Sequence, residues 1–139
     1  MTEAIPNVLF LCIHNAGRSQ MALGWFEHLA GGRATAFSGG SEPADTVNPA
    51  AIATMREVGI DLSGYAPKRW TEAALATADV VITMGCGDTC PYVPGTRYED
   101  WPVPDPAGLS VEQVRPIRDE IGTRVRALLA ELGIAAGAQ

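Results

Sequence analysis

Cys12 and Arg18 stand at the two ends of a short polar loop, in the spacing Cys-x5-Arg-Ser. A run of apolar, strand-favouring residues precedes this loop, and a helical pattern follows it from about residue 17. In such a strand–loop–helix unit, backbone N–H groups and the positive end of the helix dipole are directed at one point, where a tetrahedral oxyanion binds. We call residues 12–19 the oxyanion loop. It comprises Cys12, Ile13, His14, Asn15, Ala16, Gly17, Arg18 and Ser19.

The residue types in the oxyanion loop fit nucleophilic chemistry on a bound anion. A cysteine in a positive field favours thiolate over thiol, so Cys12 is the predicted nucleophile. Arg18 offers a planar fork of donors that suits two oxygens of phosphate, arsenate or sulfate. Ser19 is placed to donate a hydrogen bond to the Cys12 sulfur. Asn15 tolerates the left-handed backbone conformation that a tight cradle needs.

Composition limits the class of protein. The 139 residues suit one compact domain, residues 1–139, and the net charge of −6 argues against a nucleic-acid or anionic-membrane partner. With no basic start and no apolar run of membrane length, we expect a cytoplasmic protein. Three cysteines, at positions 12, 86 and 90, are too few for a secreted disulfide scaffold. Their spacing also gives poor support for zinc, so we predict no metal and no cofactor.

Strand and helix signals alternate along the chain. We predict strands near residues 8–11, 34–38, 80–84 and 98–101, and helices over about 17–30, 49–58, 71–78 and 110–132, with a loop at 38–41. This order predicts an α/β fold with a parallel sheet covered on both faces. Because ligands bind beyond the carboxyl ends of such strands, we expect Cys12 and the region of Cys86 to lie at the same edge.

The chain resembles the low-molecular-weight protein tyrosine phosphatases through the oxyanion loop and through Asp105-Pro106 late in the sequence. Within that fold it is most similar to the arsenate reductases that thioredoxin re-reduces. The run 18–22, Arg-Ser-Gln-Met-Ala, and the cysteine pair after residue 84 carry this likeness. The resemblance implies a single domain with a four-stranded parallel sheet flanked by helices.

The resemblance also implies a stepwise reduction of arsenate, for which phosphate or sulfate would be mimics. Cys12 would attack arsenate while Asp105 protonates the departing oxygen. Cys86 would attack the resulting adduct, releasing arsenite and leaving a Cys12–Cys86 disulfide. Cys90 would then attack Cys86, and thioredoxin would reduce the Cys86–Cys90 disulfide.

Several positions depart from the family pattern and keep alternatives open. Ala107-Gly108 follow the Asp-Pro pair where phosphatases carry aromatic residues, His14 replaces a usual Gly, and Gly17 replaces a frequent second Cys. One alternative is a reductase that uses only Cys12 together with mycothiol or glutaredoxin. The others are a protein tyrosine phosphatase and a phosphocarrier that passes a phosphoryl group to a partner protein.

Overall fold

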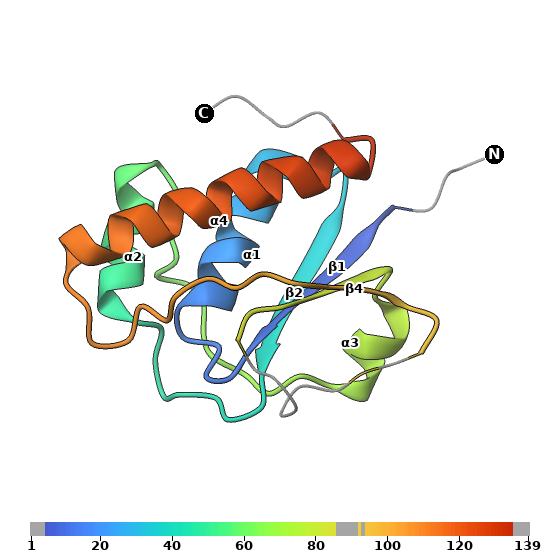
Figure 1. The fold of residues 1–139 in the computed structure, drawn as a ribbon, viewed down its shortest axis with the longest axis horizontal. Helices are drawn as coiled ribbons and strands as arrows, with labels where there is room; N and C mark the ends of the chain where they lie inside the picture. Colours follow the sequence, from blue (N-terminus) through green and yellow to red (C-terminus); the bar gives the residue numbers. More distant parts are fainter. Residues whose placement is uncertain (1–4, 86–91, 93, 135–139) are drawn as a thin grey trace.

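A parallel sheet of four strands forms the centre of the computed structural model, which describes residues 5–85, 92 and 94–134 (Figure 1). The strand order is β2-β1-β3-β4, and all three pairings are parallel. The strands are β1 (Asn7–Cys12), β2 (Thr35–Gly40), β3 (Val80–Thr83) and β4 (Arg97–Asp100). The predicted four-stranded parallel α/β fold is therefore confirmed.

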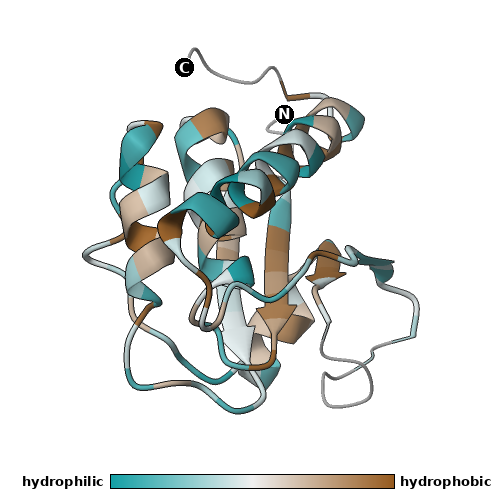
Figure 2. Ribbon diagram, turned by 60° about the vertical axis from the view of Figure 1, so that its left-hand side comes forward, coloured by the Kyte–Doolittle hydropathy of each residue, from teal (hydrophilic) through white to brown (hydrophobic). Residues whose placement is uncertain are grey.

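Helices cover both faces of the sheet. Successive side chains of β1 point to opposite faces, and each face is apolar and packs against helices. Val8 and Phe10 belong to a large apolar cluster with α1, α2 and α4, whereas Leu9 and Leu11 pack with α3. Figure 2 shows hydrophobic residues, coloured brown, in the strands at the centre of the molecule. The helices are α1 (Arg18–Ala30), α2 (Pro49–Glu57), α3 (Glu72–Thr77) and α4 (Val111–Glu131). Across the described part of the chain, no helix has the length and apolar character needed to cross a membrane.

The helix ends follow the signals in the sequence. Side chains of Asn48, Thr71 and Ser110 accept backbone hydrogen bonds at the starts of α2, α3 and α4, and Ser110 forms a complete capping box. Gly31 ends α1 in the left-handed conformation, with φ of 57°. Predicted boundaries of strands and helices agree with the structure to within one or two residues.

The loop predicted at residues 38–41 is wrong in part, because Gly39 and Gly40 belong to β2. The Gly40 N–H donates to the Lys68 carbonyl (2.9 Å), and the Gly40 carbonyl accepts from the Trp70 N–H (3.3 Å). A Cβ at Gly39 would lie 2.8 Å from the Trp70 Cα. These glycines therefore mark a close backbone approach at the sheet edge rather than a turn.

An ion-pair cluster joins α2 to α4. Glu57 contacts Arg115 and Arg118, each at 2.8 Å, and the buried Arg118 also donates to the Thr54 carbonyl (3.0 Å). The hydrogen bond from Arg115, together with that from Arg118, lowers the pKa of Glu57 to about 2. Ionised Glu57 is thus the form that holds the two helices together.

We expect Glu57→Gln to lower stability at neutral pH, measured as the urea midpoint of unfolding. Because folding lowers the pKa of Glu57, its contribution is complete above about 4.5 and is lost as the pH falls toward about 2. The difference between variant and parent should therefore shrink over that range. Glu120→Gln, which removes an exposed pair with Arg124, is the matched control. A difference that stays constant with pH would contradict this role.

Candidate active site

Five consecutive carbonyls of the oxyanion loop, from residue 13 to residue 17, point away from its centre. Their donors are Glu42 N (2.8 Å) for Ile13, Ala44 N (3.0 Å) for His14, Gln20 Nε2 (3.0 Å) for Asn15, Asn48 N (2.7 Å) for Ala16 and Met21 N (2.9 Å) for Gly17. In a trans peptide the N–H points opposite to the C=O, so the N–H groups of residues 14–18 turn inward. The loop is therefore a concave set of backbone donors, suited to an oxyanion.

The start of α1 adds to this positive field. Gly17 occupies the N-cap position and supplies no side-chain hydrogen bond to the first turn. The first N–H groups of a helix have no partner within the helix, and they carry the positive end of its dipole. An anion above Cys12 would meet these donors directly.

Asn15 adopts the left-handed conformation that its residue type predicted, with φ of 50°, and is fully buried. Its Oδ1 accepts from the Lys68 N–H (3.0 Å) and from Gln20 Nε2 (3.1 Å). Its Nδ2 donates to the Ser19 Oγ (2.7 Å). Three partners from two parts of the chain, the start of α1 and the segment at residue 68, thus hold this left-handed residue.

The Ser19 hydroxyl lies 2.8 Å from the sulfur of Cys12, a residue that is only 2% exposed. The Ser19 oxygen accepts from Asn15, and a Cys12 thiolate, which can only accept, receives the hydroxyl proton of Ser19. A hydrogen bond of this kind stabilises a thiolate more than a thiol. Asn15 and Ser19 form a continuous path of donors that ends at Cys12.

The Arg18 side chain is buried in the wall of the pocket that Cys12 also lines, and its guanidinium is fixed from several sides. Its Nη1 donates to the Val103 carbonyl (3.2 Å), and its Nη2 lies 3.7 Å from the Asp105 carboxylate. A Cβ on Gly85 would lie 2.3 Å from Nη1, so the glycine leaves space for the arginine. Arg18 is therefore held in place before any anion binds.

Asp105 lies at the opening of the site, with its side chain half exposed. Its Oδ1 accepts from the Ala107 N–H (3.0 Å), and the neighbouring Pro106 packs on the oxyanion loop. A Cβ at Gly17 would be 2.5 Å from the Pro106 Cγ. Gly17 has φ of −132°, so this contact, and not backbone strain, is the reason for a glycine here.

These groups line one small pocket of about 40 Å³, which has room for about three or four water-sized spheres. Its walls are Cys12, His14, Ala16, Gly17, Arg18, Asn48, Asp105 and Ala107. Ser19 supports the pocket from behind through its hydrogen bond to Cys12, and Asn15 does so through its hydrogen bond to Ser19. Cys86 and Cys90 lie outside the described residues.

Sequence reasoning missed four residues of this arrangement. The sequence Asn48-Pro49 predicts only the start of a helix, although Asn48 also lines the pocket. Ala107 was considered only for the aromatic side chain that it replaces. Gln20 and Lys68 support Asn15, and no sequence signal linked either of them to it.

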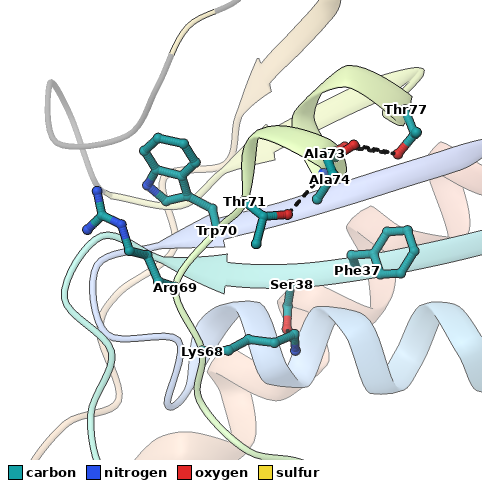
Figure 3. Close-up of a pocket in the computed structure, with 9 residues that line it drawn as sticks. All are labelled: Phe37, Ser38, Lys68, Arg69, Trp70, Thr71, Ala73, Ala74 and Thr77. Carbon is teal, nitrogen blue, oxygen red and sulfur yellow. Dashed lines mark hydrogen bonds between the residues drawn. The ribbon is translucent and has the colours of Figure 1, made fainter.

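A second hollow, of about 310 Å³, lies on the α3 face of the sheet. Figure 3 shows Phe37 of β2 facing Thr71, Ala74 and Thr77 across it. Trp70 also lines this hollow, and the Arg69 guanidinium carbon lies 5.0 Å from the centre of the Trp70 ring. Cys12, Arg18 and Asp105, the described residues that are predicted for catalysis, do not line this hollow.

We expect Ser19→Ala to slow alkylation of Cys12 by iodoacetamide at neutral pH by about tenfold, since a charge-assisted hydrogen bond contributes roughly 1.5 kcal/mol. The measurement is the rate of modification of the peptide that contains Cys12, followed by mass spectrometry. Ser63→Ala, at an exposed position, is the control. An unchanged rate in Ser19→Ala would show that the contact does not stabilise the thiolate.

Gly17→Ala should destabilise the protein by about 1–3 kcal/mol, because the new methyl group overlaps Pro106. Urea unfolding measures this change. Gly64→Ala is the matched control, since a Cβ at Gly64 meets nothing within 4 Å. Equal free energies of unfolding for the two variants would refute the close contact.

Known proteins share both the sequence pattern and the fold. The chain is 39% identical over 122 residues to arsenate reductase 2 of Staphylococcus epidermidis, covering 85% of this chain and 92% of the relative. It is 40% identical over 131 residues to the glutaredoxin arsenate reductase of Synechocystis, covering 92% and 99%.

Solved structures give the same picture. The thioredoxin-dependent arsenate reductase of Corynebacterium glutamicum superposes with a TM-score of 0.81 at 38% identity, over 96% of this chain and 64% of that one. An arsenate reductase in the phosphate-binding state superposes with a TM-score of 0.78 at 38% identity, over 91% and 98%. The model of the low molecular weight phosphotyrosine protein phosphatases matches residues 7–136, and the chain belongs to this family.

Proposed function

We propose that residues 1–139 act as one arsenate reductase domain, with Cys12 as nucleophile and thioredoxin as the reductant. The observation that carries the proposal is the ring of inward N–H groups around the Cys12 sulfur, closed by Arg18. This ring fits an anion of four oxygens. The similarity to arsenate reductases over most of the chain supports arsenate as that anion.

The walls of the pocket favour a free oxyanion over a phosphotyrosine side chain. No Phe, Tyr or Trp among the described residues lines the pocket to hold a phenyl ring. Ala107 stands directly after the Asp-Pro pair and offers only a methyl group. These features support reduction of arsenate over hydrolysis of phosphotyrosine.

In the first step, the Cys12 thiolate attacks arsenic and an arsenate oxygen leaves as water. Asp105 donates the proton to the departing oxygen. The carboxylate lines the same pocket as the sulfur, and Arg18 lies between Asp105 and the Val103 carbonyl. The product of this step is a Cys12–arsenic(V) adduct.

In the second step, the Cys86 thiolate attacks the Cys12 sulfur. The electron pair of the sulfur–arsenic bond passes to arsenic, which leaves as arsenite, and a Cys12–Cys86 disulfide forms. Cys90 then attacks Cys86, which restores Cys12, and the thioredoxin dithiol reduces the Cys86–Cys90 disulfide. The position of Gly85 supports this role for Cys86, the next residue in sequence, because Gly85 lies against Arg18.

The relative from Synechocystis favours a second candidate for the reductant. That protein is named a glutaredoxin arsenate reductase and is 40% identical to this chain. In a reductase of this kind, a small thiol would attack the arsenic adduct on Cys12, and glutaredoxin would complete the reduction.

Cysteine variants distinguish the two reductants. Without reductant, the parent protein should release one arsenite per chain and acquire a Cys86–Cys90 disulfide, detected by mass spectrometry. Cys90→Ser should also release one arsenite, but it should retain a Cys12–Cys86 disulfide and fail to turn over repeatedly with thioredoxin. Cys12→Ser should be inactive, since it lacks the nucleophile.

Three outcomes would contradict the relay or the substrate. Sustained turnover of Cys86→Ser with a small thiol and glutaredoxin would favour the single-cysteine mechanism. Rapid cleavage of a phosphotyrosine peptide without arsenate reduction would indicate a phosphatase. Stable phosphocysteine on Cys12 after incubation with a donor protein would indicate a phosphocarrier.

A further inference from the structure

We propose that Asn48 binds the substrate directly, through a hydrogen bond from its side-chain amide to an oxygen of the bound oxyanion. This inference rests on the Cys12 pocket being an oxyanion site, and it does not depend on the reduction that follows. Asn48 lines that pocket together with Cys12 and Arg18, but it comes from the start of α2. It would add a donor from outside the oxyanion loop.

Three of the four polar groups of Asn48 are already engaged. Its backbone N–H donates to the Ala16 carbonyl (2.7 Å), and its carbonyl accepts from the Ile52 N–H (3.0 Å). Its Oδ1 accepts from the Ala50 N–H (2.8 Å) at the start of α2. The remaining group, the Nδ2 amide, has no partner within residues 5–85, 92 and 94–134.

The cap fixes which end of the amide is free. Oδ1 faces the Ala50 N–H, and exchanging the two ends of the amide would bring two donors together. Nδ2 is therefore the free end, and it can only donate. An oxyanion in the adjoining pocket is a suitable acceptor, and a hydrogen bond to a charged oxygen is stronger than one to a neutral oxygen.

Asn48 also helps to shape the oxyanion loop through its backbone. Its backbone N–H holds the Ala16 carbonyl outward and so helps to turn the next N–H of the loop inward. The same residue begins α2, whose Pro49 follows at the first helical position. Asn48 thus joins the loop, the helix and the anion through one side chain and its backbone.

The test separates the amide from the cap. Asn48→Ser keeps an oxygen for capping and loses the amide donor. Asn48→Asp keeps the size and the capping oxygen, but a carboxylate oxygen replaces the amide donor. Asn48→Ala loses both the capping oxygen and the amide donor. The affinity for inorganic phosphate is measured from its protection of Cys12 against iodoacetamide. The thermal unfolding temperature of each variant shows whether the helix cap still stabilises the protein. Thr71→Ala, which removes the cap of α3 away from the pocket, is the control.

We expect phosphate to bind on the order of tenfold more weakly to Asn48→Ser, and more weakly still to Asn48→Asp, because a carboxylate repels the anion. Both should unfold near the temperature of the parent protein, whereas Asn48→Ala and Thr71→Ala should unfold earlier. Phosphate affinity in Thr71→Ala should be unchanged.

Parent-like phosphate affinity in the Ser and Asp variants would overturn the inference. The same conclusion would follow if only Asn48→Ala bound phosphate weakly, since the cap alone would then matter. A parent protein that binds phosphate but does not reduce arsenate would refute the proposed function and leave this result intact.

Discussion

The rest of the site depends on hydrogen bonds that five carbonyls of the oxyanion loop accept from donors outside its pocket. Each carbonyl needs an external donor, and these donors come from the segment after β2, from the start of α2 and from α1. The N–H groups face the sulfur only while those partners are in place. The fold therefore surrounds a short loop with hydrogen-bond donors, and Cys12 and Arg18 lie in the pocket that results.

Local patterns in the sequence predicted what local geometry determines. The left-handed Asn15 and the contact of Ser19 with Cys12 involve neighbours along the chain, so residue type and spacing were sufficient to predict them. The parallel sheet followed from the alternation of strand and helix signals. Asp105 required the Asp-Pro motif and the family resemblance, because nothing local connects it to Arg18.

Residues that meet only in three dimensions could not be predicted in this way. Gly17 is a glycine because Pro106 lies against it, and Gly40 extends β2 because Lys68 and Trp70 pair with it. In each case the partner lies more than 25 positions away, beyond the reach of periodicity or capping rules.

The near-complete burial of Cys12 has a consequence for electron delivery. Cys12, a residue that is 2% exposed in a pocket of about 40 Å³, is sterically screened from the surface of another protein. Disulfide exchange requires one sulfur to approach another along the line of the bond that breaks. In the proposed reductase, a protein reductant would therefore not reach Cys12 in place, and oxidising equivalents would leave the pocket on a carrier, either a second cysteine of the chain or a diffusible thiol.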